Sequence, residues 1–132
     1  MHQIVRDRID WEQPFPPEEY ADRRAKVAKA LEAAGYAGIL VTAPRDVYWL
    51  TGHDQIWQYK GGLTGLFFDA ASASFLFFDN ASHQAVVSTT PQIVDIVYHP
   101  RGKMQDQVRF VVEQVAKRGW AKSGTVAIQT WN

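Results

Sequence analysis

The chain has 132 residues, 46% of them hydrophobic and 21% charged, which predicts a single folded domain rather than a disordered segment. Basic and acidic residues balance at 14 each, so no basic excess is present to attract nucleic acids or an anionic membrane, and no apolar run approaches the roughly 20 residues that a membrane helix needs. Cysteine is absent, which excludes disulfides and thiolate metal sites and leads us to expect a cytoplasmic protein.

The N-terminal part of the chain divides into an arm and a helix. Residues 1–16 are polar and end in a Pro-rich stretch, which is typical of an extended arm. Residues 17–34 are predicted to form a helix, because a proline opens this range and a glycine follows it. The apolar positions recur at helical spacing, and this places Arg23 and Arg24 on the outward face.

A buried strand and a short helix are predicted next. The run AGILVTA at 37–43 is continuously apolar, as in a strand covered on both faces. A short helix over 44–52 should bury one face, so we expect Tyr48 and Leu50 in the core. Trp49 suits either the core or a dimer contact.

The remaining pattern completes an α/β domain over residues 17–132. Small or turn-forming residues separate several short apolar runs, and one amphipathic stretch precedes a last strand. The order predicts one three-layer α/β domain, with helices on the faces of a mixed sheet of about six strands. The further elements are strands at 63–69, 74–79, 83–89 and 93–100, a helix at 103–118 and a strand at 125–130.

Motifs for independent catalysis are missing from the sequence. The Gly-rich stretch KGGLTG at 60–65 precedes a strand, whereas a phosphate cradle precedes a helix. Neither H-E-x-x-H nor G-x-S-x-G occurs. The four histidines, His2, His53, His83 and His99, have no helical spacing to one another, so no local metal pair is predicted. We expect His83 and His99 at the surface near turns, and no catalytic or metal-binding residue in this chain.

The run from Glu18 to Asp54 combines an Arg-led helix, a glycine turn, an apolar strand and a proline. It ends in Tyr48-Trp49-Leu50-Thr51-Gly52, a Tyr-x-Leu-Thr-Gly-like motif. This combination resembles the start of the creatinase and Xaa-Pro peptidase family, the pita-bread metallohydrolases. GTVAIQ at 124–129 is similar to the GRIGVE-like strand of that family, with Gln129 where Glu is common.

The resemblance spans residues 17–132 and covers only the N-terminal domain of the family. In such enzymes a C-terminal catalytic domain follows, and its two Asp, one His and two Glu ligands hold two divalent metals (Mn, Co or Zn). None of those motifs occurs in this sequence. The resemblance therefore implies an isolated N-terminal domain that is inactive alone, binds no metal of its own and belongs to a hydrolase of C–N bonds.

The resemblance also implies partners and a substrate-binding segment. Family enzymes are usually homodimers, in which the N-terminal domain of one subunit leans over the catalytic pocket of the other. On this sequence the loop that would reach the partner's pocket carries His53, Trp57, Tyr59 and Lys60. Trp57 and Tyr59 would wall the pocket, and His53 or Lys60 would meet the carboxylate of a small-molecule or dipeptide substrate.

Two features of the sequence bear on the branch of the family. The helix opening PPEEYADR and the loop HDQIWQYKGG are more similar to creatinase and ectoine-hydrolase-like members, which open small non-peptide amides or amidines, than to proline peptidases. Creatinase presents an Arg in this loop, but this chain has none between Arg45 and Arg101, and Lys60 offers a point charge instead of a bidentate fork. The alternative function is a freestanding α/β module that binds a small ligand or a partner through the aromatic loop.

Overall fold

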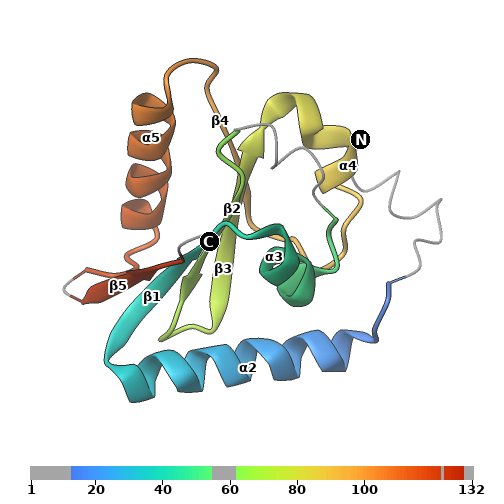
Figure 1. The fold of residues 1–132 in the computed structure, drawn as a ribbon, viewed down its shortest axis with the longest axis vertical. Helices are drawn as coiled ribbons and strands as arrows, with labels where there is room; N and C mark the ends of the chain where they lie inside the picture. The colour runs from blue at the N-terminus through green and yellow to red at the C-terminus, as the bar shows by residue number, and fades with distance from the viewer. Residues whose placement is uncertain (1–12, 55–61, 123, 130–132) are drawn as a thin grey trace.

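A computed structural model describes residues 13–54, 62–122 and 124–129, and Figure 1 shows its helices and strands. The domain is built of helices on both faces of one sheet, as the sequence predicts. Its elements are, in chain order, α2 (Pro17–Ala34), β1 (Tyr36–Val41), α3 (Pro44–Thr51), β2 (Gly65–Asp69), β3 (Ser74–Asn80), η2 (Ala81–His83), α4 (Gln84–Val87), β4 (Ile96–His99), α5 (Met104–Lys117) and β5 (Thr125–Ile128).

The sheet is mixed and has the strand order β4-β3-β2-β1-β5. Strand β2 runs antiparallel to both β1 and β3, whereas β4 pairs parallel with β3 and β5 pairs parallel with β1. The carboxyl ends of β1, β3, β4 and β5 therefore lie at one end of the sheet, together with the start of β2. Loops from four strands converge at that end.

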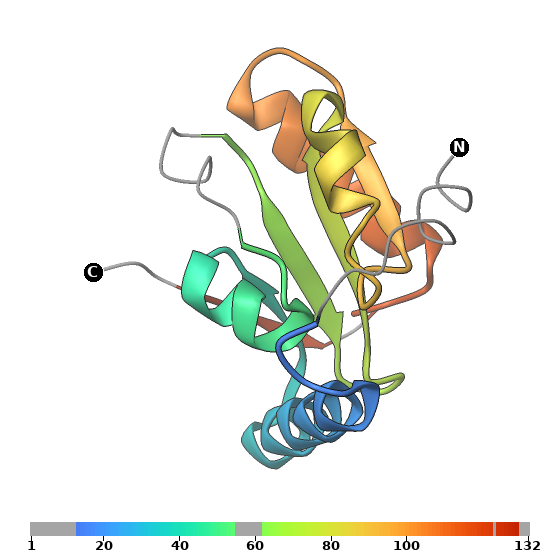
Figure 2. The same ribbon diagram turned by 90° about the vertical axis from the view of Figure 1, so that its right-hand side faces the viewer.

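Alternation along the central strands divides the core between two helix layers. In β2, Phe68 packs with residues of α2 and α3, whereas Phe67 packs with α5. Strand β3 alternates in the same way, with Phe77 on the first face and Phe78 on the second. Figures 1 and 2 show α5 on one side of the sheet and α2 with α3 on the other. A period of two residues is expected of a strand, and here both faces are apolar because both are covered.

One predicted strand is wrong, and the sheet has five strands instead of about six. Residues 83–89 were expected to be extended, but the chain turns into the 3₁₀-helix η2 and then α4. The reason is a cap at the end of β3, where the Asn80 side chain accepts a hydrogen bond from the Ser82 N–H at 2.9 Å. That cap starts a helical turn, and of the apolar residues in α4 only Val87 is buried.

The first helix layer confirms the predicted ends and corrects two predicted faces. Both α2 and α3 end at a glycine with positive φ, Gly35 at 77° and Gly52 at 74°, as the sequence indicates. Arg23 was expected to face outward, but it is 7% exposed because α3 packs against that side of α2. Leu50 is buried as predicted, whereas Tyr48 is 40% exposed, so its assignment to the core is wrong. Trp49 is also 40% exposed.

Candidate functional site

Several of the buried polar side chains of the domain lie at the carboxyl end of the parallel strands, among them Asp79 and His99. In α/β sheets, ligands bind in the crevice outside this end, because loops from several strands meet there. The predicted site residues Trp57, Tyr59 and Lys60 belong to segment 55–61, between α3 and β2 in the sequence. That segment lies outside the described residues.

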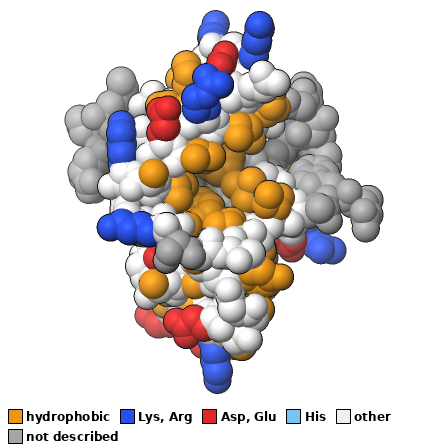
Figure 3. Space-filling model, turned by 90° about the vertical axis from the view of Figure 1, so that its left-hand side faces the viewer, with side chains coloured by type: hydrophobic (Ala, Val, Ile, Leu, Met, Phe, Trp, Pro, Cys, Tyr) orange, Lys and Arg blue, Asp and Glu red, His pale blue; other side chains and the backbone are white. Residues whose placement is uncertain are grey.

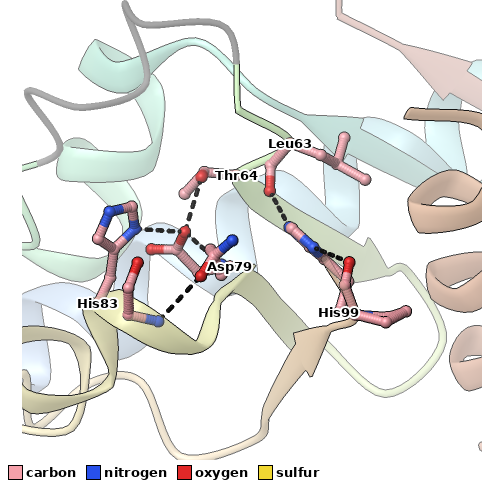
Figure 4. Close-up of polar contacts among 8 residues, drawn as sticks. Leu63, Thr64, Asp79, His83 and His99 are labelled. Carbon is pink, nitrogen blue, oxygen red and sulfur yellow. Dashed lines mark hydrogen bonds and ion pairs between the residues drawn. The ribbon is translucent and has the colours of Figure 1, made fainter. Parts of the chain in front are cut away.

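Asp79 is the centre of the polar cluster. It lies at the end of β3 and is completely buried. Its Oδ1 atom accepts hydrogen bonds from the Thr64 hydroxyl at 2.9 Å and the Asn80 N–H at 2.6 Å, and from His83 Nδ1–H at 2.8 Å (Figure 4). A buried carboxylate requires such donors, since water cannot solvate it there.

His83 is positioned by the same carboxylate. The turn through η2 brings its ring back to Asp79, four residues earlier, and leaves its side chain 28% exposed. A bond from Nδ1–H to a carboxylate fixes the ring orientation, an arrangement used to orient imidazoles for binding or proton transfer. The Thr64 hydroxyl, however, donates to Asp79 and not to His83, so these three side chains do not form a nucleophile–base relay.

His53, a predicted substrate contact, is placed within the core at the start of the loop. It is 3% exposed, its Nδ1 atom lies 3.0 Å from the Thr90 hydroxyl, and its ring meets Phe77 edge-on. Burial lowers the pKa of His53, and the negative charges of Asp79 and Asp54 only partly oppose this effect. The lowered pKa favours the neutral imidazole. The contact with Thr90 holds His53 in place just after the end of α3.

The depressed pKa of His53 predicts a loss of stability in acid. An unfolded histidine has a pKa of about 6.5, so below about pH 6.5 the unfolded state binds more protons than the folded state. The free energy of unfolding should fall as the pH falls through this range, by at most about 1.4 kcal/mol per pH unit from this residue. His53→Asn keeps a hydrogen-bonding group near Thr90 but does not titrate. Urea unfolding at about pH 7.5 and about pH 5.5 should therefore show a smaller fall in the free energy of unfolding for this variant than for the native protein. An equal change in the free energy of unfolding between the two pH values in both proteins would contradict a lowered pKa of His53.

His99 and Tyr98 extend the cluster along β4. His99 was expected at the surface, but it is 3% exposed because its Nε2–H donates to the Leu63 carbonyl at 2.6 Å (Figure 4). That bond fixes the chain just before Thr64. Burial raises the pKa of Tyr98, and the charge of Asp79 raises it further. The Tyr98 hydroxyl is buried and makes no hydrogen bond with any described residue.

Gln129 joins the last strand to the helix α3. Its Oε1 atom accepts hydrogen bonds from the N–H groups of Thr42 at 3.1 Å and Ala43 at 2.8 Å, and its Nε2 atom donates to the Asp46 carboxylate. A Glu at this position, as is common in the family that the sequence resembles, would bring a second carboxylate to Asp46. The amide of Gln129 avoids that repulsion, since it supplies both a donor and an acceptor.

The sequence did not identify Asp79 and Thr64 as site residues. Two segments of the chain end in the same letters, LFFD at 66–69 and 76–79. Because β2 and β3 are antiparallel, Asp69 lies at the opposite end of the sheet, where it accepts hydrogen bonds from the N–H and hydroxyl of Ser72 in a turn. The opposite directions of β2 and β3 therefore decide that Asp69 lies in a turn and Asp79 in the polar cluster. Among the described residues no group of three or more His, Cys, Asp or Glu side chains could hold a metal ion.

Comparison with protein families gives one match. The model of the Creatinase/Prolidase N-terminal domain family matches residues 23–132. The chain belongs to this family. A comparison with curated proteins finds no match. No helix in residues 13–54, 62–122 or 124–129 is long and apolar enough to cross a membrane.

Solved structures show the same fold as this creatinase/prolidase N-terminal domain. A dipeptidase from Pyrococcus horikoshii OT3 is 19% identical with a TM-score of 0.66, and the match covers 83% of this chain and 28% of the dipeptidase. An Xaa-Pro aminopeptidase chain from Streptococcus pyogenes is 14% identical with a TM-score of 0.54, over 83% of this chain and 92% of that one. This chain thus spans little more than a quarter of the dipeptidase. At these identities the likeness concerns the fold alone.

Proposed function

We propose that this creatinase/prolidase N-terminal domain is a non-catalytic part of a two-metal hydrolase of C–N bonds, where it covers the substrate pocket of the partner subunit in a homodimer. The family match over residues 23–132 carries the proposal. The catalytic domain would follow this one in the same polypeptide and hold two divalent metals, Mn, Co or Zn, with ligands that this sequence does not supply. The enzyme would be cytoplasmic.

The working segment in this proposal runs from His53 to Lys60. Both of its flanks are anchored by buried polar contacts, His53 with Thr90 on one side and Thr64 with Asp79 on the other. Anchors of this kind reduce the freedom of a loop and thereby the entropy lost when it closes on a ligand. Trp57 and Tyr59 would contribute rigid apolar walls, Lys60 a cation for a substrate carboxylate, and His53 the neutral end of the segment.

Two observations support a substrate class for this proposal. The loop sequence favours the branch that opens small amides or amidines, whereas the structurally similar proteins are named as a dipeptidase and an Xaa-Pro aminopeptidase. A small molecule or dipeptide with a free carboxylate satisfies both. Lys60 is the residue through which this carboxylate would be recognised.

Removal of both aromatic walls should reduce turnover without unfolding the domain. In an active enzyme that contains this domain, changing Trp57 and Tyr59 to Ala together should lower kcat/KM at least tenfold, about 1.4 kcal/mol of transition-state stabilisation. The matched control is Tyr36→Ala, because Tyr36 is 39% exposed and stands at the opposite end of the sheet. Steady-state kinetics with thermal unfolding of each variant tests this prediction. If the double variant and the control retain equal kcat/KM, the segment does not contact the substrate.

A further inference from the structure

Strand β5 meets the rest of the domain in two ways. Val126 and Ile128 border a hydrophobic hollow beside α5, which Figure 3 shows in its space-filling view. Directly after the strand, the Gln129 N–H continues the pairing with β1 by donating to the Leu40 carbonyl at 3.0 Å. The Gln129 side chain, in contrast, makes polar contacts with the first turn of α3 and with the residues just before it. Gln129 thus joins the end of β5 to the start of α3.

Two backbone donors determine how the Gln129 amide is oriented. Its oxygen faces the N–H groups of Thr42 and Ala43, so its nitrogen faces Asp46 and requires an acceptor there. The Asp46 carboxylate is such an acceptor. A glutamate at 129 would bring a second carboxylate, and two adjacent carboxylates disfavour each other's charge. An asparagine at 46 would relieve this conflict, because its amide can donate to a glutamate. The residues at these two positions are therefore matched as a pair.

A continuous series of hydrogen bonds leads from Gln129 through α3 to His53. It begins at the Ala43 N–H, which donates to Gln129 at 2.8 Å, and the Ala43 carbonyl accepts from the Val47 N–H at 3.0 Å. The Val47 carbonyl accepts from the Thr51 hydroxyl at 2.7 Å, and the Thr51 Oγ1 atom accepts from the His53 N–H at 3.0 Å. Val47 and Thr51 are completely buried, and hydrogen bonds are stronger in buried surroundings than in water. A displacement at Gln129 therefore has a contiguous path to His53.

His53 is the residue at which this series meets the proposed substrate segment. Its backbone N–H is held from α3, and its ring is held by Thr90 and by an edge-on contact with Phe77. We propose that Gln129 is a positioning residue, which sets the start of α3 and, through α3, the place of His53. This role rests on the proposed function, because the segment that covers the substrate pocket there begins at His53. Gln129 controls the segment from the other end of α3.

The first test is hydrogen exchange of backbone amides in the whole chain, followed by NMR. Gln129→Glu should accelerate exchange of the His53 N–H about tenfold, because the hydrogen bonds that lead to it are loosened. The Phe77 N–H in β3, which donates to the Asp95 carbonyl at 2.9 Å, reports on the sheet and should exchange at the native rate. Gln105→Glu is the charge control, since Gln105 is exposed on α5, and it should change neither rate.

The second test measures kcat/KM in an active enzyme that contains this domain. Gln129→Glu should lower kcat/KM about fivefold, and combining it with Asp46→Asn should restore kcat/KM to within about twofold of the native value. Asp46→Asn alone should be close to native, because an asparagine oxygen still accepts from Gln129. Thr51→Val removes the hydroxyl in the middle of the series, so adding Gln129→Glu to it should lower kcat/KM no further.

Several results would overturn this role of Gln129. An unchanged exchange rate of the His53 N–H would do so. Equal acceleration at His53 and Phe77 would also do so, because it would reflect only a lower stability of the whole domain. Unchanged kcat/KM in Gln129→Glu, or no recovery when Asp46→Asn is added, would have the same consequence.

Failure of this role and failure of the proposed function are distinguished by the double variant of Trp57 and Tyr59. If that variant lowers kcat/KM while Gln129→Glu does not, pocket covering stands and only the positioning role is lost. If it retains full kcat/KM, the proposed function fails, and the role of Gln129 within it fails as well.

Discussion

Replacing Asp79 with alanine is expected to lower the free energy of unfolding by about 3–5 kcal/mol. Asp79 is completely buried, and its carboxylate accepts hydrogen bonds from Thr64, Asn80 and His83. The variant removes the common acceptor of those three donors, of which the Thr64 hydroxyl lies in the buried core. Urea unfolding followed by circular dichroism measures the change.

The matched control for this variant is Asp106→Ala. Asp106 pairs with Arg109 at 3.5 Å, and both side chains are more than half exposed. An exposed ion pair of this type contributes about 0–1 kcal/mol, so the control should remain close to the native protein. The free energy of unfolding of Asp79→Asn should lie between those of Asp79→Ala and Asp106→Ala. The amide oxygen can still accept a hydrogen bond from Thr64, but the negative charge that holds His83 is lost. If Asp79→Ala were no more destabilising than Asp106→Ala, the carboxylate would not organise this end of the sheet.

Replacing Arg23 with alanine is expected to cost about 2–4 kcal/mol of stability. The guanidinium donates from Nη1 to the Trp49 carbonyl at 2.7 Å and from Nε to Glu19 at 3.0 Å. It also lies 4.3 Å from the ring centroid of Phe15 and 5.0 Å from that of Trp49. Arg23 thus satisfies a carbonyl in the last turn of α3 and joins α2 to the helix from which the loop at His53 departs.

Arg23→Lys separates geometry from charge. Lysine keeps the positive charge but has no planar fork to stack on two rings and reach the Trp49 carbonyl together, so it should lose most of the same stability. Arg45→Ala is the control, because its side chain is 90% exposed and its ion pair is with the adjacent Asp46. Thermal and urea unfolding compare the three. Native-like stability of Arg23→Lys would show that charge alone accounts for the effect.

The layers of the fold could be predicted because they depend on local pattern. A proline at the start and a glycine at the end determine α2 and α3, and a continuous apolar run is sufficient to recognise β1 as a strand, although only Gly38 and Val41 in it are buried. Residues 83–89 were not predictable in this way. Their apolar residues are typical of a strand, but the hydrogen bond from the Ser82 N–H to the Asn80 side chain favours a helical turn.

The polar cluster could not be predicted because it depends on strand direction and helix crossing. Asp69 and Asp79 end identical tetrapeptides, and only the antiparallel pairing of β2 and β3 places one in a turn and the other at the site. Arg23 is buried since α3 happens to cross α2 at that turn. Such contacts join residues that are far apart in the sequence, and the local periodicity of apolar residues does not predict them.

The central claim is that this domain has no hydrolytic centre of its own, and metal analysis with an activity assay tests it most directly. The purified chain, loaded with Mn, Co or Zn and then dialysed, would be analysed for bound metal and incubated with Xaa-Pro dipeptides and a creatine-type amidine. We predict substoichiometric metal and no hydrolysis above the buffer rate. Stoichiometric metal together with turnover that a chelator abolishes would contradict the claim.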